Sequence, residues 1–341
     1  MAVFPWRGAR RESVGEMNPG AGLEPARAEP ADGGAGLADA TIRAIGRIVL
    51  GKDGVVRLVL SGVLAGGHIL LEDVPGVGKT TLAHAVARAL GLSFSRIQFT
   101  ADLLPADILG VSIYEPRASA FTFHPGPIFT NVLLADEINR ATPKTQSALL
   151  EAMEERQVTQ DRVTHALPEP FVVQATQNPA HQAGTFPLPE SQLDRFMMRV
   201  AVGYPSASAE RDLLRGETRR RLIEDLEPVL DASELGAMQR AAQAVRLSDP
   251  LLDYVQALLR HSRESADLAT GLSPRAGLAL VATARAWAFL DGRDFVIPED
   301  VQAVLVAVTG HRLQPTGAPP GSHPSAAEEA AERLLRAVPI P

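Results

Sequence analysis

The sequence predicts an α/β fold, a parallel sheet covered by helices on both faces, followed by an all-helical second domain. Two observations carry this prediction. Between residues 39 and 205, apolar runs of strand length alternate with segments of helical spacing, the order that builds a three-layer α/β core. After Tyr204-Pro205 the composition shifts, and nearly every segment from Ser206 to residue 341 has helical spacing. The 341 residues are long enough for two such domains.

The first 38 residues precede these patterns. They are rich in Gly, Ala, Pro, Glu and Arg and show no apolar periodicity, so we expect a disordered tail over residues 1–38. The arginines near the start are not followed by an apolar stretch, and the longest apolar run is interrupted by Arg57 and His68. Neither a signal peptide nor a membrane insertion is therefore expected, and we predict a cytoplasmic protein.

The elements of the first domain follow from residue spacing. Helical spacing runs from Ala40 to Leu64 and ends at Gly66-Gly67. The predicted strands are residues 69–71, 96–100, 131–135 and 171–175, and the predicted helices are 82–90 and 144–155, with Thr142 as N-cap of the second. Alternating runs predict two inserted β-hairpins, one over residues 111–124 and one over 157–167 with its turn at Gln160-Asp161.

The second domain is predicted to be built from helices over residues 235–245, 250–263, 275–290, 298–308 and 325–337. Asp231, Asp249 and Ser273 stand just before or at the start of three of them. Short polar side chains of this kind accept hydrogen bonds from the free N–H groups of a first helical turn, so these three residues are the predicted N-caps.

One stretch organises the first domain. Residues 72–80 read Glu-Asp-Val-Pro-Gly-Val-Gly-Lys-Thr and connect a predicted strand to a predicted helix. Glycines let backbone N–H groups turn toward a phosphate, and a helix N-terminus adds partial positive charge. Asp73 replaces the first glycine of the pattern G-x-x-x-x-G-K-[ST], so we expect the other glycines to make the turn. The predicted nucleotide-binding residues are Pro75, Gly76, Val77, Gly78, Lys79, Thr80 and Thr81.

Within this loop two side chains have separate roles. Lys79 is predicted to reach the β and γ phosphates of a nucleotide, and the Thr80 hydroxyl to hold Mg²⁺. A second pair of groups, Asp136 and Glu137, closes the predicted strand at 131–135, where a parallel sheet places its ligand-binding residues. Asp136 would orient the hydrated Mg²⁺, and Glu137 would polarise a water for attack on the γ-phosphate.

Three further residues are candidates for the site, and the first two also have a simpler structural explanation. Asn178 follows the strand at 171–175 and could lie between the attacking water and the γ-phosphate, although alone it reads as an Asn-Pro turn. Arg195 could neutralise charge on a phosphoryl group bound by a neighbouring subunit, although its spacing alone favours a surface ion pair with Asp194. Arg275 stands at a helix N-terminus, where a cation opposes the helix dipole and needs an anionic partner such as phosphate.

Composition narrows the function further. The net charge is −7, which gives no overall attraction to nucleic acid. Cysteine is absent and the eight histidines show no metal-ligand spacing, which excludes thiol chemistry and cysteine zinc sites. No N-K-x-D motif that would read a guanine base is present, and no Leu-Ser-Gly-Gly-Gln motif of ABC-type ATPases.

The motifs also occur in a fixed order along the chain. They occupy residues 72–80, 97–105, 126–129, 134–140, 175–179, 184–190, 193–196 and 273–276. In this order they resemble the motifs of MoxR-family AAA+ ATPases over roughly residues 40 to 312. The resemblance implies a P-loop AAA+ core with a C-terminal helical lid. It also implies ATP as substrate, Mg²⁺ as cofactor, and the following roles: Lys79 and Thr80 Walker A, Asp136 and Glu137 Walker B, Asn178 sensor 1, Arg195 arginine finger and Arg275 sensor 2.

The resemblance extends to assembly and partners. Family members form hexameric rings and act as chaperone-like remodellers that mature or activate other protein complexes, often with a partner bearing a von Willebrand factor A domain. The hairpin at 111–124 resembles the insert in helix 2 that marks this clade. Arg162 departs from the pattern, because related sequences usually have a glycine at this turn position.

Two other classes of function stay open on the sequence. One is a nucleic-acid motor, since relatives with the same insert include helicases, and DNA-stimulated ATPase activity would favour it. The other is an ATP-dependent assembly scaffold with little turnover. Steady-state phosphate release by the wild type and by Glu137→Gln separates a scaffold from an ATP-hydrolysing machine.

Overall fold

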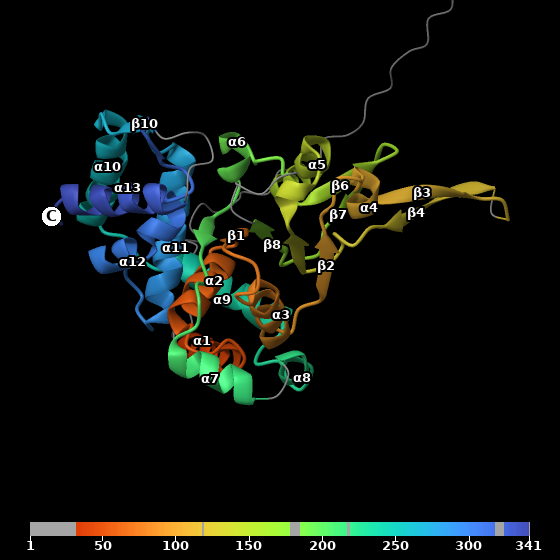
Figure 1. Ribbon diagram of the computed structural model, residues 1–341, viewed down its shortest axis with the longest axis horizontal. Helices are drawn as coiled ribbons and strands as arrows, with labels where there is room; N and C mark the ends of the chain where they lie inside the picture. The colour runs from red at the N-terminus through yellow and green to blue at the C-terminus, as the bar shows by residue number, and fades with distance from the viewer. Residues whose placement is uncertain (1–31, 118, 178–184, 217–218, 318–323, 341) are drawn as a thin grey trace, which may run out of the picture. The chain divides into compact units, whose positions relative to one another are not determined.

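The computed structural model describes residues 32–117, 119–177, 185–216, 219–317 and 324–340 (Figure 1). The first 31 residues of the predicted tail lie outside the described residues. Helix α1 (Asp32–Gly46) begins eight residues before the predicted start at Ala40, and α2 (Asp53–Leu64) follows it. The predicted continuous helix is thus two helices, separated where Gly51 has a φ of 67°, a left-handed conformation that glycine adopts without strain.

Five of the described strands form one parallel sheet in the order β2-β5-β8-β1-β9. Their bounds are β1 (Ile69–Glu72), β2 (Phe94–Gln98), β5 (Val132–Asp136), β8 (Val172–Gln177) and β9 (Met198–Val200). The central strands β5 and β8 are buried along their whole length, as strands covered on both faces must be. The four strands predicted from apolar runs are confirmed, and β9 is a fifth.

Alternate residues of the sheet belong to two separate hydrophobic cores. Ile69 and Leu71 of β1 pack into one core with α2 and α3 (Lys79–Ala89), whereas Leu70 between them packs into the other with α5 (Pro143–Glu155). This period of two is the property of a strand with helices on both faces. The predicted three-layer arrangement is therefore confirmed.

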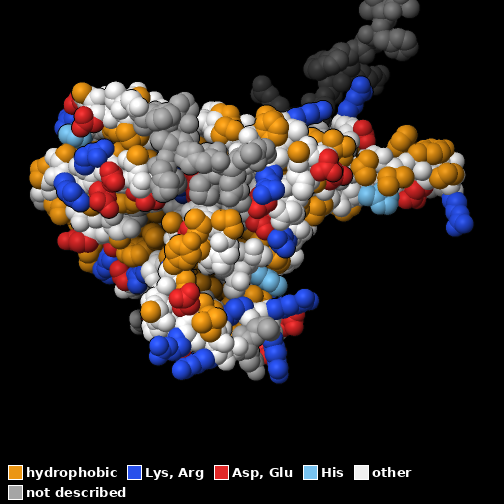
Figure 2. Space-filling model, viewed as in Figure 1, with side chains coloured by type: hydrophobic (Ala, Val, Ile, Leu, Met, Phe, Trp, Pro, Cys, Tyr) orange, Lys and Arg blue, Asp and Glu red, His pale blue; other side chains and the backbone are white. Residues whose placement is uncertain are grey.

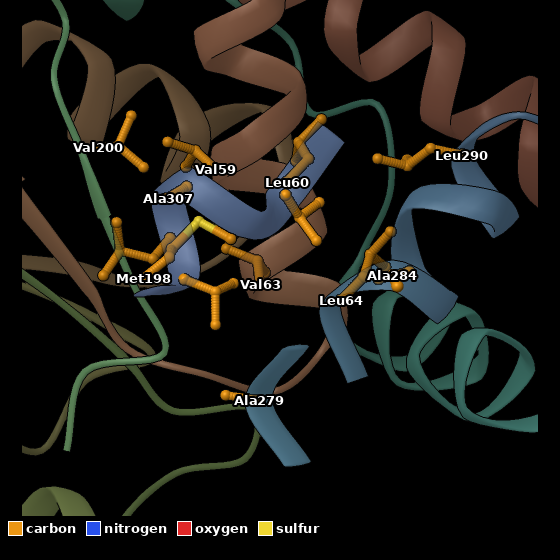
Figure 3. Packing of buried hydrophobic residues seen from close by; sticks show 14 of the residues in the cluster. Val59, Leu60, Val63, Leu64, Met198, Val200, Ala279, Ala284, Leu290 and Ala307 are labelled. Carbon is orange, nitrogen blue, oxygen red and sulfur yellow. The ribbon is translucent and has the colours of Figure 1, made fainter. Parts of the chain in front are cut away.

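The chain after β9 is mainly helical. Its helices are α7 (Ala207–Arg215), α8 (Arg219–Glu224), α9 (Ala232–Ala244), α10 (Asp249–Glu264), α11 (Pro274–Leu290), α12 (Pro298–Thr309) and α13 (Pro324–Ala337). A short antiparallel pair, β10 (Leu268–Thr270) and β11 (Gln314–Pro315), interrupts them. Figure 3 shows how this part joins the sheet: Val59, Leu60, Val63 and Leu64 of α2 face Met198 and Val200 of β9 and the alanines of α11.

Three of the four predicted N-caps stand at the N-cap position, and the fourth, Asp249, is wrong. The Asp231 carboxylate accepts hydrogen bonds from the N–H groups of Ser233 and Glu234, and Ser273 caps α11 in the same way. Helix α10 is capped by Ser248, because Asp249 is already its first helical residue. Thr142 stands at the N-cap of α5, but its hydroxyl interacts with the Thr145 hydroxyl rather than with the helix backbone.

Both predicted hairpins are present beside the sheet. The first pairs β3 (Gly110–Glu115) with β4 (Ala120–Pro125) and follows the short helix α4 (Pro105–Leu109), and the second pairs β6 (Gln157–Gln160) with β7 (Val163–Ala166). The second turns at Asp161 and Arg162, one residue later than predicted, with φ values of 50° and 68°. Both turn residues are thus left-handed, as in the tight turns that suit the twist of a hairpin, and Arg162 adopts the conformation without being glycine.

The first hairpin extends outward from the sheet (Figure 1). Its Phe123 ring stacks on His165 of the second hairpin, with ring centroids 4.1 Å apart. The remaining short elements are η1 (Ile138–Arg140) and α6 (Glu190–Leu193). Among the described residues, no helix combines the length and the apolar character that crossing a lipid bilayer requires.

Candidate functional site

The predicted phosphate loop joins the carboxyl end of β1 to the N-terminus of α3. Gly76 and Gly78 have φ values of 85° and 95°, so these two glycines make the tight turn, and Gly78 is the N-cap of α3. A Cβ atom built on either glycine would meet no other atom within 4 Å. The loop therefore faces open space, while the free N–H groups of the first turn of α3 are arranged as an anion site requires.

Lys79 lies folded inside this loop. Its ammonium Nζ donates to the carbonyl oxygens of Asp73, at 2.5 Å, and Val74, at 3.3 Å. Burial lowers the pKa of Lys79, against the raising effect of the carboxylates of Asp73, Asp136 and Glu137. An ammonium that burial disfavours and carboxylates only partly compensate is well placed to receive phosphate oxygens.

Asp73, the departure from the glycine pattern, has its own structural role. Its φ is not positive, so the position does not need a glycine. One carboxylate oxygen accepts the N–H of Val74 at 2.7 Å, and the other accepts the N–H of Gly203 at 2.5 Å. Gly203 lies between β9 and α7, so Asp73 ties the phosphate loop to the segment that leads into the helical part.

The carboxyl ends of three adjacent strands bring the candidate residues together. Ala135 of β5 pairs with Ala175 of β8, which pairs with Leu70 of β1, so Asp136 ends its strand level with Thr176 and next to the phosphate loop. Glu137 follows in a left-handed conformation, with φ 57°. The chain turn at Glu137 is what lets two adjacent carboxylates serve one site, although neighbouring strand residues point to opposite faces.

Both carboxylates are held by specific partners. Asp136 is buried, and its oxygens accept from the Thr176 hydroxyl at 2.6 Å and from the Arg96 guanidinium at 2.6 Å. Glu137 accepts from Gln98 Nε2 at 2.9 Å and is paired with Arg140 at 2.8 Å. Arg96 and Gln98 project from the same side of β2, so a single edge strand orients both carboxylates.

The residues present also suit the implied magnesium ion. Hydroxyl and carboxylate oxygens are the ligands that Mg²⁺ prefers, and Thr80 and Asp136 supply one of each beside the open face of the loop. Asn178, the remaining predicted residue of this site, lies outside the described residues, just beyond the end of β8.

Arg195 and Arg275 lie together, on one carboxylate. The Arg195 guanidinium Nη1 is 3.0 Å from Glu154 Oε2 and also donates to the carbonyl of Leu150 at 2.8 Å. Arg275 Nη1 is 3.3 Å from Glu154 Oε1. Arg275 lies at a helix N-terminus, where a cation needs an anionic partner. In this chain that partner is Glu154.

These two arginines lie near the amino end of β1, whereas the phosphate loop follows its carboxyl end. They line a pocket of about 330 Å³ together with Gly66, Gly67 and His68, the residues just before β1. The phosphate loop, none of whose residues lines this pocket, leaves β1 at its other end. Because a four-residue strand spans roughly 13 Å, both guanidiniums are separated from Lys79 of the same chain by at least the length of β1.

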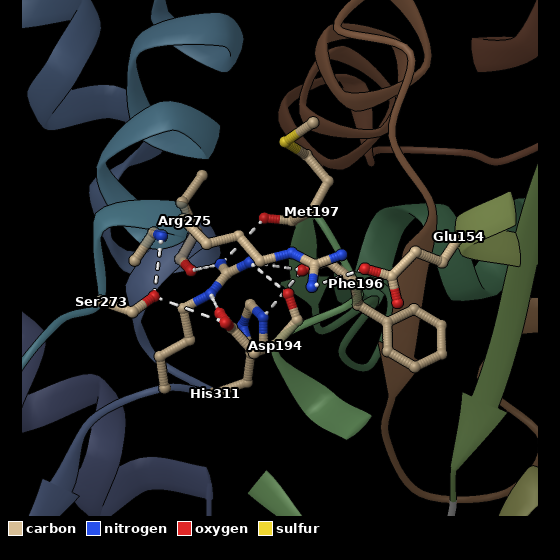
Figure 4. Close-up of polar contacts among 10 residues, drawn as sticks. Glu154, Asp194, Phe196, Met197, Ser273, Arg275 and His311 are labelled. Atoms are coloured by element: carbon tan, nitrogen blue, oxygen red, sulfur yellow. Dashed lines mark hydrogen bonds and ion pairs between the residues drawn. The ribbon is translucent and has the colours of Figure 1, made fainter. Parts of the chain in front are cut away.

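A buried arginine fixes the segment that carries Arg195 (Figure 4). Arg312 follows α12, and its guanidinium donates to the Asp194 carboxylate at 2.7 Å and to the carbonyl oxygens of Phe196 at 2.7 Å and Met197 at 3.1 Å. Ser273, the cap of α11, donates to the same Asp194 carboxylate at 3.4 Å. The helical part and residues 194–197 are thus joined by charge-assisted hydrogen bonds.

His68 joins the sheet to the end of α5 near the same pocket. Its Nδ1 accepts the N–H of Val173 at 3.0 Å, so the neutral ring carries its proton on Nε2, which donates to Met153 O at 3.1 Å. Burial is the largest cause that lowers the pKa of His68 to about 4; the hydrogen bond to Met153 O opposes it, and the charges of Arg156 and Arg275 lower the pKa as well. The structure therefore requires the neutral imidazole.

Acid is expected to destabilise the protein through this residue. A folded-state pKa below the unfolded value stabilises the fold above the unfolded pKa, and the stabilisation is lost as pH falls from about 6.5 toward 4. Between pH 7 and pH 5 the free energy of unfolding should fall by about 2 kcal/mol because of His68. His311, whose pKa burial lowers well below its ordinary value, acts in the same direction.

Urea unfolding followed by circular dichroism at the two pH values measures this effect. His68→Gln should be less stable than wild type at pH 7 but should lose less stability on acidification. The exposed His261→Gln is the matched control and should keep the wild-type pH dependence. Equal losses in wild type and His68→Gln would contradict the assignment.

Several residues of these sites were not singled out from the sequence. Arg96 and Gln98 have a signal in retrospect, because polar and apolar residues alternate over residues 96–100. Glu154 looks like any glutamate near an exposed helix end, and Arg312 stands in a loop, so neither has a local signal. Glu154 is 41 residues from Arg195 and 121 from Arg275, and Arg312 is 118 residues from Asp194, so these contacts exist only in the folded chain.

Comparison with known proteins agrees with this geometry. A family model described as "ATPase family associated with various cellular activities (AAA)" matches residues 68–198, which contain the first four strands of the sheet along the chain and both nucleotide motifs. A model of the AAA lid domain matches residues 260–334, in the helical part. The ATPase assignment therefore rests on the family match as well as on the loop and carboxylates, and the chain is an ATPase of the AAA type.

Relatives match over nearly the full chain. Chaperone MoxR1 of Mycobacterium tuberculosis is 42% identical over 88% of this chain and 83% of its own length. The uncharacterized protein YeaC of Bacillus subtilis strain 168 is 46% identical over 87% of this chain and 92% of its own. The solved structure of a presumed ATPase from Cytophaga hutchinsonii superposes with a TM-score of 0.82 at 36% identity, covering 91% and 97% of the two chains. Sequence, fold and relatives together place this chain in the MoxR family of AAA+ ATPases.

Proposed function

We propose that the protein is a ring-forming ATPase that uses Mg²⁺-dependent ATP hydrolysis to remodel, mature or activate another protein complex. The observation that carries this proposal is the separation of the two halves of the hydrolytic machinery. The phosphate loop and the carboxylates lie at the carboxyl ends of the strands, whereas Arg195 and Arg275 lie near the amino end of β1. Arginines that are distant from their own phosphate loop are suited to the loop of a neighbouring copy.

Each subunit would thus contribute to two sites. In the first, Lys79 and the N–H groups of α3 bind the β and γ phosphates, and Asp136 orients the metal, which neutralises phosphate charge when bound. Glu137 takes a proton from the attacking water, and Asn178 would help to place that water. In the second, Arg195 and Arg275 stabilise the charge that develops on the γ-phosphate held by the adjacent subunit.

A head-to-tail arrangement of identical subunits follows from this division. One surface of each copy must meet a different surface of the next, and such heterologous contacts close into a ring when the rotation between subunits permits. The hexamer of related proteins is the closed form that we propose here. Without a neighbour, each site lacks its arginines and should turn over slowly.

The first hairpin supports a protein client. Val111, Ile113, Tyr114 and Phe121 on β3 and β4 are between 43% and 72% exposed, and Figure 2 shows apolar side chains along the projecting hairpin. Exposed apolar surface of this kind marks a contact site for another protein. A client complex, together with an adaptor bearing a von Willebrand factor A domain, is the partner that we propose from the family.

Client capture with a hydrolysis-deficient variant tests this function. Glu137→Gln subunits incubated with Mg²⁺ and ATP are expected to sediment as a hexamer and to retain client proteins on affinity purification, whereas the same variant in ADP retains fewer. Glu137→Gln combined with Phe121→Ser is the matched control, which should assemble but retain less client.

Several outcomes would contradict the proposal. If Glu137→Gln stays monomeric at all concentrations in ATP, the proposed ring is wrong. Equal client retention in ATP and ADP, or retention of nucleic acid in place of protein, would contradict the proposed remodelling of a protein complex. Strong DNA stimulation of phosphate release would instead favour the nucleic-acid motor.

A further inference from the structure

Glu154 lines the pocket of the two arginines but has no part in the proposed function. It stands next to last in α5, where the negative end of the helix dipole disfavours a carboxylate. It nevertheless accepts both arginines at once, with Arg195 at 3.0 Å from one oxygen and Arg275 at 3.3 Å from the other. A residue that opposes a local preference while bridging two candidate catalytic groups has a role beyond helix formation.

The pocket around these arginines is rich in positive charge. Arg156, Arg195, Arg275 and Arg312 line it, against two carboxylates, Glu154 and Asp194. Asp194 is bound by Arg312, itself 5% exposed, and by the Ser273 hydroxyl. Arg156 donates to the carbonyl of Gly66, so Glu154 is the carboxylate that pairs with Arg195 and Arg275, and Figure 4 shows its side chain pointing toward the arginines.

The two ion pairs of Glu154 are open to water. The side chains of Glu154, Arg195 and Arg275 are 39%, 30% and 46% exposed. Ion pairs with this exposure are weak, because solvent screens the charges. A triphosphate, with several oxygens and a larger charge, binds guanidinium groups more strongly than a single carboxylate does. The arginines can thus exchange one anion for the other.

We propose that Glu154 is a positioning residue that occupies, in the free subunit, the place of the neighbour's γ-phosphate. It holds the two guanidiniums side by side as one anion-binding pair, and it must give them up when a triphosphate-loaded subunit docks. Glu154 therefore weakens ATP-dependent association and keeps arginines without a neighbour from binding other anions. This inference rests on the proposed sharing of sites between subunits.

Subunit association in a hydrolysis-deficient background tests the inference without interference from turnover. We would compare Glu137→Gln with Glu137→Gln/Glu154→Gln by sedimentation velocity over a range of subunit concentrations. With Mg²⁺ and ATP, loss of the Glu154 charge is expected to lower the concentration of half-maximal assembly by roughly 3- to 10-fold. With ADP, which has no γ-phosphate, the two proteins should assemble alike.

Glu155→Gln in the same background is the matched control, because it removes the same charge from the adjacent exposed residue. It should leave the assembly midpoint in ATP unchanged. Adding Arg195→Ala and Arg275→Ala should remove the effect of Glu154→Gln, since the charge then has no partner to release. Glu154→Asp, whose shorter arm cannot reach both arginines equally, should show a smaller shift and serves if the glutamine variant folds poorly.

The inference is overturned if Glu154→Gln leaves the midpoint in ATP unchanged or raises it, or if the shift is equal in ATP and ADP. An equal shift would mean a general effect of charge or of α5 stability. Failure of the shared site itself has a different signature: the Glu137→Gln parent would show no ATP-dependent assembly at all.

Discussion

Glu137→Gln is expected to lower the rate of ATP hydrolysis by roughly 10²- to 10⁴-fold while ATP still binds. The amide has the size of the carboxylate and can still accept from Gln98 and Arg140, which now bind Glu137 at 2.9 and 2.8 Å, so the local structure should persist. It cannot take a proton from water, however. Lys79 and the first turn of α3, which provide the phosphate contacts, are untouched.

Steady-state phosphate release and binding of a fluorescent ATP analogue measure the two effects separately. The dissociation constant should stay within about 3-fold of wild type, since a single neutralised carboxylate near the phosphates changes binding only modestly. Glu151→Gln, an exposed glutamate on α5, is the control and should hydrolyse ATP as wild type does. Hydrolysis at the wild-type rate in Glu137→Gln would remove this residue from its proposed role.

The layers of the fold could be predicted because they depend on local patterns. The strands at 131–135 and 171–175 are continuous apolar runs of the kind that lies between two helical layers, and both became central strands within one or two residues of the predicted ends. The ends shifted because hydrogen bonds to neighbouring strands decide them. Strand β9 was not predicted as a strand, since three residues carry too little pattern.

The candidate site divides in the same way. The phosphate loop and the Asp136-Glu137 pair are contiguous in sequence, so their chemistry is visible in the order of residue types. The position of Arg275 in the fold cannot be predicted from the sequence, because it depends on how α11 packs against α2 and on the hydrogen bonds of Arg312 to residues 194–197. From the sequence Arg275 is a cation at a helix N-terminus that needs an anion, but only the packing of the helical part identifies Glu154 as its partner.

Arg195→Ala is expected to leave nucleotide affinity nearly unchanged and to lower hydrolysis by roughly 10³-fold, the usual contribution of an arginine supplied by a neighbouring subunit. The reason is position: Arg195 lies across the sheet from the phosphate loop of its own chain, so it cannot contribute to binding there. Phosphate release and analogue binding measure the change, and the exposed Arg260→Ala on α10 is the control for loss of a surface cation.

Mixing two inactive variants decides whether the arginine acts between subunits. An Arg195→Ala subunit keeps its own carboxylates, and a Glu137→Gln subunit keeps its arginine, so a site formed by the first and completed by the second is intact. In a random equimolar ring about a quarter of the sites have this composition, and the mixture should recover about a quarter of wild-type activity. Arg195→Ala mixed with a subunit that carries both substitutions should recover none. If the first mixture also stays inactive, Arg195 serves its own subunit or only the fold, since no arrangement of shared sites would leave every interface incomplete.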